Sequence, residues 1–284
     1  MIRNFFKRLY FAFRPSQRIV LLDYPVEPKA VYSAEHPHKG LSVIISGNDE
    51  FYKTLLLFSL QFKEQFRSIK DNNITTDQTQ PGWNNDFMPG LDIIMLYTLI
   101  NYYKPGRYLE IGSGTSTKTA LKARKENNLD FSIHCIDPHP RQEIRMIADK
   151  WYGSYIQDLP LTIFSDLSEN DIVFFDGTHM LYPNSDVLWF YLEVLPVLPK
   201  GVIVQVHDIY IPYDYPQFML DKYYSENYLL GALLINNPLK YEVLSPNFYI
   251  SEQKHLSGIL AELWQDPGLQ KTEQHGGSFW FRVK

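Results

Sequence analysis

Residues 108–120 read YLEIGSGTSTKTA. An apolar run typical of a buried strand ends there in two glycines one residue apart, and helix-forming residues follow directly. Glycine lets the backbone turn tightly and approach a ligand closely, and the first N–H groups of a helix lack intrahelical partners and can bind an anion. The stretch therefore predicts a strand, a tight turn and a helix, with the turn as a candidate binding loop.

The chain around this loop alternates between predicted strands and helices. Short apolar runs predict strands, and 3.6-residue periodicity predicts helices, in the order helix 90–103, strand 107–111, helix 115–128, strand 131–137, helix 141–152, strand 154–157, strand 171–176, helix 186–198 and strand 201–208. This alternation is typical of a doubly wound α/β fold with a mostly parallel sheet. A helix at about 218–236 and two late strands, 241–250 and 277–283, predict an antiparallel pair at one sheet edge.

Composition and charge limit the classes of protein to which this chain can belong. The 284 residues are 45% hydrophobic and 21% charged, which suits a globular protein with a sizeable core. We expect an N-terminal extension over 1–82 and a main domain over 83–284, because the polar stretch 71–86 separates them. The net charge of −5 offers no general positive field, so nucleic acid is not an expected partner. The single cysteine, Cys135, excludes internal disulfides and suits a cytoplasmic location.

The N-terminal residues 1–18 are basic and aromatic. Lys7 and Arg8 interrupt what would be the core of a signal peptide, and no apolar run reaches the roughly 20 residues that cross a bilayer. Wound as a helix, this segment separates aromatic from basic side chains. Two interpretations stay open: peripheral contact with an anionic membrane, or docking on the chain's own domain or on another subunit of a homo-oligomer.

Candidate ligand-binding residues come directly after the predicted strands. In a doubly wound sheet, ligands bind at the carboxyl ends of the strands. Gly112 and Gly114 end the first strand, with hydroxyls beside them that can cap the helix or contact a ligand: Ser113, Thr115 and Ser116. Asp137 ends the second strand, where a carboxylate can hold both hydroxyls of a ribose.

The type of cofactor follows from two departures from the dinucleotide-binding pattern. That pattern has a third glycine where Thr117 stands, and Glu110 places a negative charge where NAD would bring its phosphates. A cofactor with an amino group and a ribose but no phosphate, such as S-adenosylmethionine, suits the loop better. The plainer alternative is a tight turn that binds nothing.

Four stretches together resemble class I S-adenosylmethionine-dependent methyltransferases: LEIGSGTST, CIDPHP, DIVFFDGTH and GVIVQVHDIYIPYDYP. The chain is similar to the bacterial branch called methyltransferase family 24 and, more distantly, to O-methyltransferases of the macrocin type. The resemblance covers roughly 83–250. It implies a seven-stranded Rossmann-like sheet and methyl transfer to an oxygen of a small-molecule or saccharide-like acceptor.

The resemblance also implies roles for single residues in cofactor binding. Glu110 and the 112–114 loop would lie near the methionine part of the cofactor. Asp137, followed by Pro138, would hold the ribose, and Asp158 would face the adenine. For Asp158 the alternative is a turn or capping residue.

Four residues are the expected catalytic centre: Asp176, His179, His207 and Asp208. The enzyme must align the acceptor with the methyl donor and remove the acceptor's proton. Histidine, with a pKa near 6.5, is the natural base, and His207 is favoured over His179; a purely structural role is the alternative for each.

A metal site is also implied. Macrocin-type relatives hold magnesium with acidic groups after the fourth and fifth strands, where Asp176 and Asp208 stand in this chain. His207 replaces the acidic neighbour, and magnesium prefers oxygen ligands.

Two other functions compete with methyl transfer. An NAD(P)-linked oxidoreductase would share the sheet, but Thr117 and the lack of an obvious Tyr-x-x-x-Lys pair count against it. A non-catalytic binding module that keeps the cofactor fold is the second alternative.

Overall fold

A seven-stranded sheet forms the centre of the computed structural model, which describes residues 10, 13 and 23–284. The strand order is β3-β2-β1-β4-β5-β7-β6. The strands are β1 (Arg107–Ile111), β2 (Ser132–Ile136), β3 (Lys150–Tyr152), β4 (Ile172–Phe175), β5 (Ile203–Val206), β6 (Tyr241–Pro246) and β7 (Phe279–Val283). The first five pair in parallel, and β7 runs antiparallel between β5 and β6. The predicted doubly wound, mostly parallel sheet with an antiparallel pair at one edge is confirmed.

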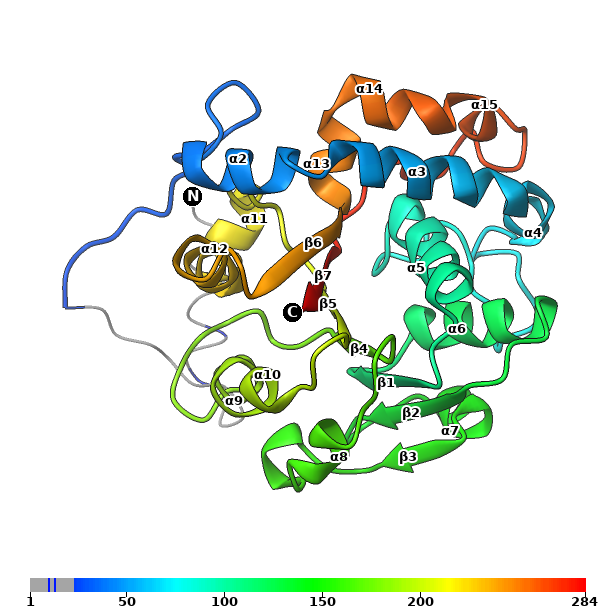
Figure 1. Ribbon diagram of the computed structural model, residues 1–284, viewed down its shortest axis with the longest axis horizontal. Coiled ribbons are helices and arrows are strands. Elements are labelled where there is room, and N and C mark those ends of the chain that lie inside the picture. Colours follow the sequence, from blue (N-terminus) through cyan, green and yellow to red (C-terminus); the bar gives the residue numbers. More distant parts are fainter. Residues whose placement is uncertain (1–9, 11–12, 14–22) are drawn as a thin grey trace.

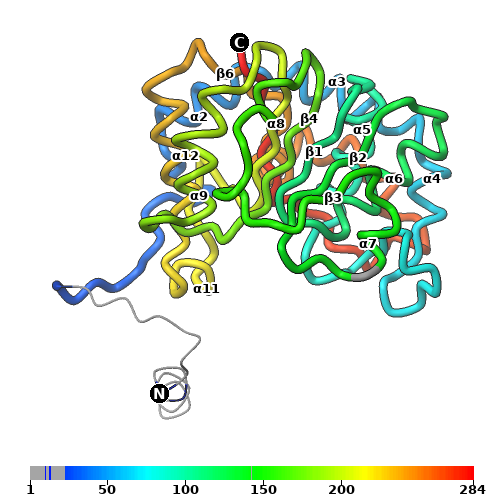
Figure 2. The backbone as a smooth tube through the Cα atoms, turned by 90° about the horizontal axis from the view of Figure 1, so that it is seen from below, coloured from blue at the N-terminus to red at the C-terminus, as the bar shows by residue number. Residues whose placement is uncertain are grey.

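Helices cover both faces of this sheet (Figure 1). On one side lie α5 (Gly90–Tyr103) and α6 (Thr115–Glu126), and on the other lie α9 (Asp186–Trp189) and α12 (Glu226–Asn236) (Figure 2). Because the central strands are buried on both faces, β4 consists wholly of buried apolar residues. The expected helix 186–198 is one run in which α9 continues through the π-helical η3 (Phe190–Val194) into α10 (Leu195–Val197).

Four predicted elements were wrong in type or extent, and two of them lie before residue 208. The helix expected at 141–152 ends early as α7 (Gln142–Ile147), and β3 occupies 150–152. The strand expected at 154–157 is instead a short 3₁₀ helix, η2 (Ile156–Asp158). The helix ends early because Asp149 pairs with β2. The Asp149 N–H donates to the carbonyl of Ile133 at 2.8 Å, and the Asp149 carboxylate accepts from the Ile133 N–H at 2.7 Å. These two hydrogen bonds hold the chain beside β2, at the edge of the sheet.

The other two differences lie after residue 208. The helix expected at 218–236 is divided into α11 (Gln217–Leu220) and α12. The N–H groups of Ser225 and Glu226 donate to the carbonyl of His179 at 2.9 and 3.3 Å, which fixes the start of α12 there. The strand expected at 241–250 ends at Pro246, where α13 (Asn247–Glu252) begins.

The segment before the sheet is helical and packs on the rest of the molecule. It forms α2 (Lys39–Ser46), α3 (Asp49–Ser59), the 3₁₀ helix η1 (Leu60–Phe62) and α4 (Lys63–Ser68). Side chains such as Ile45, Tyr52 and Leu55 belong to the same hydrophobic core as the sheet. Most of the N-terminal stretch 1–18, for which membrane contact and docking on the protein itself or on another subunit were the two interpretations, lies outside the described residues. Within the described part of the chain, no helix is both long and apolar enough to span a bilayer.

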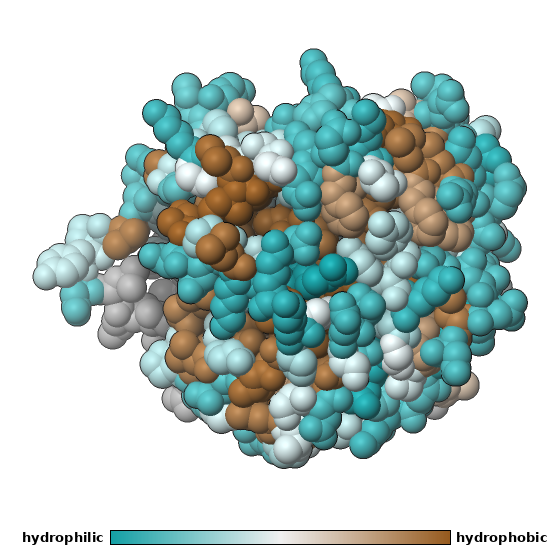
Figure 3. All heavy atoms as spheres, viewed as in Figure 1, coloured by the Kyte–Doolittle hydropathy of each residue, from teal (hydrophilic) through white to brown (hydrophobic). Residues whose placement is uncertain are grey.

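The surface in the view of Figure 3 is mainly hydrophilic, with several separate apolar patches. The insertion between β6 and β7 adds further helices: α13, α14 (Lys254–Ser257), the 3₁₀ helix η4 (Gly258–Leu260) and α15 (Ala261–Trp264). Since Val206 at the end of β5 pairs with Phe279 at the start of β7, this insertion lies at the edge of the sheet where the parallel strands end.

Candidate active site

The glycine loop after β1 is shaped by its contact with the end of β4. Gly112 has a φ of +80°, and a Cβ placed on it would lie 2.2 Å from the carbonyl oxygen of Asp176. Only glycine fits there, because the backbone conformation and the close approach both exclude a side chain. The next residue, Ser113, donates from its N–H and its hydroxyl to Asp137, at 3.1 and 2.6 Å. The loop and the Asp137 carboxylate therefore lie on one rim.

Glu110 lies beneath this loop and holds it through hydrogen bonds. Its carboxyl group is fully buried and accepts hydrogen bonds from the hydroxyls of Ser116 and Thr117. Thr117 also accepts the N–H of Gly114 at 3.1 Å, which explains why a hydroxyl stands where a dinucleotide-binding loop has glycine. Burial raises the pKa of Glu110 to about 8. The residue lines neither of the two cavities described next. The structure places it beneath the loop, and the resemblance implied a place near the methionine part of the cofactor.

Two cavities meet at Asp176. The larger, about 540 Å³, is lined by five residues singled out in the sequence: Gly112, Asp137, Pro138, Asp158 and Asp176. The smaller cavity, about 130 Å³, is lined by Asp176 again, by His207 and by the rest of the loop, which is Ser113, Gly114, Thr115 and Ser116. A Cβ on Gly114 would meet no atom within 4 Å, so this glycine keeps space open above the loop. Sequence reasoning missed other lining residues, among them Phe87, Arg141, Tyr182 and Asp186.

The four expected catalytic residues come together at the ends of β4 and β5. Asp176 Oδ1 lies 3.4 Å from His179 Nε2 and 3.8 Å from His207 Nδ1. Asp208 reaches the same two rings, with Oδ1 3.4 Å from His207 Nδ1 and Oδ2 3.4 Å from His179 Nε2. Each imidazole thus faces the same two carboxylates through one of its nitrogens.

Two fully buried acids extend this cluster and were not among the site residues expected from the sequence. Glu226 Oε2 lies 3.1 Å from His179 Nδ1, and Asp92 Oδ2 lies 3.6 Å from His207 Nε2. Asp92 had one signal in the sequence, since it is the lone carboxylate in the apolar helical run GLDIIMLYTLI. Glu226 had only its place on the helix predicted at about 218–236, from which it could line the same cleft.

The carboxylates keep both imidazoles charged. Burial acts to lower the pKa of each histidine, but the nearby acids outweigh it and raise the pKa of His179 to about 11 and that of His207 to about 9. Burial likewise acts to raise the pKa of Asp176, and the two imidazoles hold it below its usual value. At neutral pH the centre therefore contains two imidazolium ions among carboxylates.

This donor set does not fit the magnesium site that the resemblance implied. The oxygens of Asp176 and Asp208 face imidazolium nitrogens, and magnesium needs several oxygen ligands in near-octahedral geometry. Over residues 10, 13 and 23–284, no group of three or more His, Cys, Asp or Glu side chains is arranged to hold a metal ion. The expectation of magnesium at Asp176 and Asp208 is not supported.

Comparison with known proteins identifies the central part of this chain. Residues 109–209, from β1 to just beyond β5, match the family model described as "Methyltransferase domain". An uncharacterised protein of Archaeoglobus fulgidus is 32% identical over 95 residues, which are 31% of this chain and 43% of that protein, so the chain spans less than half of this relative. The SAH-bound methyltransferase PaMTH1 of Podospora anserina overlaps 68% of this chain and 77% of its own, with 16% identity and a TM-score of 0.41. The family match confirms that residues 109–209 resemble a methyltransferase domain, as the sequence motifs indicated.

Proposed function

We propose that this methyltransferase domain transfers a methyl group from S-adenosylmethionine to an oxygen of a small-molecule or saccharide-like acceptor in the cytoplasm. The observation that carries the proposal is the meeting of two cavities at Asp176, one lined by Asp137 and the other by the 113–116 loop and His207. All residues that line the larger cavity, and all but Phe87 and Met88 of those that line the smaller one, lie within the matched segment.

The larger cavity suits an adenosine group. Asp137 already accepts from Ser113 and from the N–H of His139 at 2.8 Å. An ionised carboxylate has about four acceptor sites, so these three hydrogen bonds leave Asp137 capacity for about one ribose hydroxyl. Asp158 lies further along the same cavity, where it can accept from an exocyclic amino group. The 113–116 loop would then hold the methionine part, with the N–H groups at the start of α6 available to its carboxylate.

The histidine–aspartate cluster supplies the remaining chemistry. S-adenosylmethionine, when bound, provides a methyl group activated by a positively charged sulfur. Asp176 lines both cavities as an anion, so it can stabilise that charge and orient the donor.

Removal of the acceptor's proton falls to His207 with Asp208. His207 lines the smaller cavity, and its buried Nε2 makes no hydrogen bond within the described part of the chain. Asp208 contacts Nδ1 on the opposite side of the ring, and the buried Asp92 faces Nε2 at 3.6 Å. The neutral imidazole is the proton acceptor, and Asp208 stabilises the imidazolium that forms. Glu226 fixes His179 as the second cation of the cluster.

Calorimetric titration of the purified chain with S-adenosylhomocysteine and, separately, with NADH tests this function. We expect saturable binding of S-adenosylhomocysteine and none of NADH. Binding of NADH alone would favour the oxidoreductase alternative. A protein that binds S-adenosylhomocysteine but transfers no methyl group to any of a panel of hydroxylated compounds would point to the non-catalytic module.

A further inference from the structure

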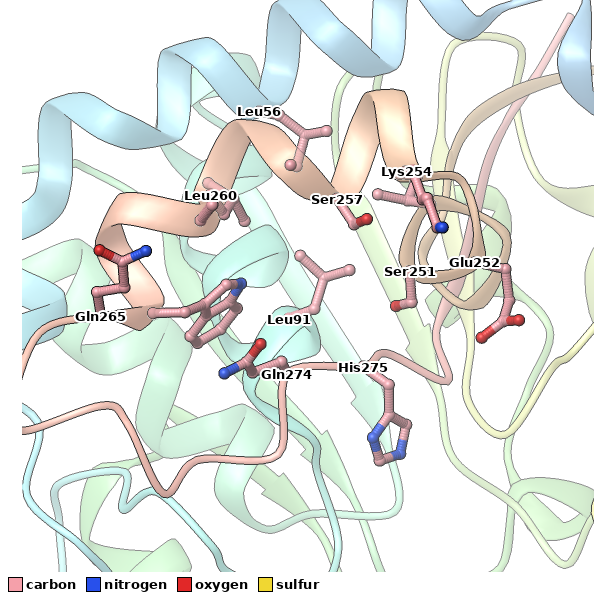
Figure 4. A pocket seen from close by; sticks show the side chains of 14 residues that line it. Leu56, Leu91, Ser251, Glu252, Lys254, Ser257, Leu260, Gln265, Gln274 and His275 are labelled. Carbon is pink, nitrogen blue, oxygen red and sulfur yellow. The ribbon is translucent and has the colours of Figure 1, made fainter.

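A third cavity, of about 560 Å³, lies under the β6–β7 insertion (Figure 4). Its walls come from α3, the start of α5, the helices α13 to α15 and residues 274–275. None of the lining residues falls within the matched segment 109–209. This cavity is therefore built wholly by parts of the chain outside the methyltransferase match.

The floor of the cavity is apolar. Leu56, Leu91 and Leu260 are buried and lie among the polar side chains in Figure 4. Ile250 and the indole of Trp264 complete this floor and are also buried. Such a surface suits the C–H face of a ring, because aromatic and aliphatic side chains bury it without needing a polar partner.

The rim of the cavity is polar and has hydrogen-bonding capacity to spare. The exposed side chains of Glu252, Lys254, Gln274 and His275 make no hydrogen bond or ion pair with any other described residue. Ser257 donates to a backbone carbonyl at 3.2 Å and keeps its acceptor sites. Because the rim carries one acid and one amine, it favours neither an anion nor a cation, and every group on it can pair with a hydroxyl.

We propose that this cavity binds an uncharged saccharide ring. Its volume lies within the roughly 300–1,000 Å³ of typical small-molecule sites, which combine an apolar lining with a few polar groups. A sugar ring has the matching surface, with C–H groups on its faces and hydroxyls around its edge. The site goes beyond the proposed methyl transfer, since binding there requires neither cofactor nor chemistry.

The cavity is close to the reaction centre but separated from it by backbone. His275 lines the cavity, and two residues later the N–H of Gly277 donates to Asp92 Oδ2 at 2.8 Å. Two residue steps span at most about 7.6 Å between Cα atoms. On the cavity side, the hydroxyl of Ser251 accepts from the N–H of Gly276 at 3.0 Å. Residues 275–278 thus form a thin wall between the saccharide site and the catalytic acids.

Nuclear magnetic resonance of the ¹⁵N-labelled full chain tests the site, with methyl α-D-glucopyranoside and maltose as probes. The chain has five tryptophans, and the variant Trp264→Phe identifies the indole N–H signal of Trp264. We expect that signal to shift saturably as either probe is added. An unmoved Trp264 signal at millimolar concentrations of both probes would overturn the proposal.

A blocking variant gives the sharper result. Gly258 lines the cavity at φ −61° and ψ −20°, and a Cβ there would meet no atom within 4 Å, so Gly258→Phe fits the backbone and adds a large side chain at the cavity wall. It should abolish the shift, whereas the matched control Gly268→Phe, on an exposed turn outside the cavity, should leave it unchanged. A shift that persists in Gly258→Phe would contradict the proposal.

Gln274→Ala keeps the test decisive if Gly258→Phe does not fold, since loss of one hydrogen bond should weaken probe binding roughly fivefold. Unchanged affinity in that variant would count against the proposal. S-adenosylhomocysteine added to the same wild-type sample separates the two claims. If it binds while the sugars do not, only the saccharide site fails; if the sugars bind while it does not, only the proposed function fails.

Discussion

Glu110, which lies beneath the loop, makes the stability of the folded protein depend on pH. Its pKa is about 8 in the folded protein, against a usual value of 4.5. Between these values the folded state holds a proton that the unfolded state has released, so the free energy of unfolding falls as pH rises, by at most about 1.4 kcal/mol per pH unit. Glu110→Gln removes this term and should flatten the pH dependence of the urea midpoint. Glu193→Gln, an exposed control, should follow the wild type; parallel curves for all three proteins would refute this role.

Asp137 is the residue on which cofactor affinity should depend most. Asp137→Asn keeps the size of the side chain but loses the charge and half of its acceptor sites. Hydrogen bonds to charged groups contribute about 1.5–3 kcal/mol, so the affinity for S-adenosylhomocysteine should fall roughly tenfold to a hundredfold by calorimetry. The exposed Asp166→Asn serves as the control. An affinity that Asp137→Asn leaves unchanged would mean that the ribose is held elsewhere.

His207 makes methyl transfer depend on pH. Only its neutral form accepts a proton, and with a pKa of about 9 that form is scarce at neutral pH. The single-turnover rate with an identified acceptor should therefore rise with pH and level off above about 9. His207→Gln should lower the rate by about 10²–10⁴-fold, and His134→Gln, a partly buried histidine on β2, should not. A rate that declines as pH rises, or that survives His207→Gln, would assign the base to another residue.

Among the elements, the turn between β1 and α6 offers a matched pair of glycines. Gly112→Ala forces a Cβ to 2.2 Å from the Asp176 carbonyl at a positive φ, and should destabilise the protein by about 2–4 kcal/mol. Gly114→Ala meets nothing within 4 Å and should change stability by less than about 1 kcal/mol. Its methyl group nevertheless projects into open space beside the smaller cavity, so cofactor affinity should drop. Urea denaturation and calorimetry on both variants check this, and equal stability losses would contradict it.

The helix α5 and the strands β1 and β3 show how far element bounds can be predicted from the sequence. The bounds of α5 and β1 follow from the sequence because Lys104, Pro105 and Gly106 separate two strongly apolar runs. The position of β3 does not, because it depends on bonds from Asp149 to β2, which is distant in sequence. Local periodicity reports which face of an element is apolar, and it carries no information about such a partner.

At the scale of the whole molecule, the reaction centre depends on contacts between distant parts of the chain. The Gly277 N–H reaches Asp92 across 185 residues, and Glu226 reaches His179 across 47. The residues that end the strands could be predicted, because parallel strands finish at one edge. The acids that face the histidines from α5 and α12 could not, since their place depends on how whole helices pack.

A crystal structure of the chain with S-adenosylhomocysteine tests the central claim most directly. The account predicts the adenosine in the 540 Å³ cavity with its ribose hydroxyls on Asp137, and the homocysteine against the 113–116 loop with its sulfur near Asp176. Density for the ligand in any other cavity, or a ribose that does not contact Asp137, would contradict it.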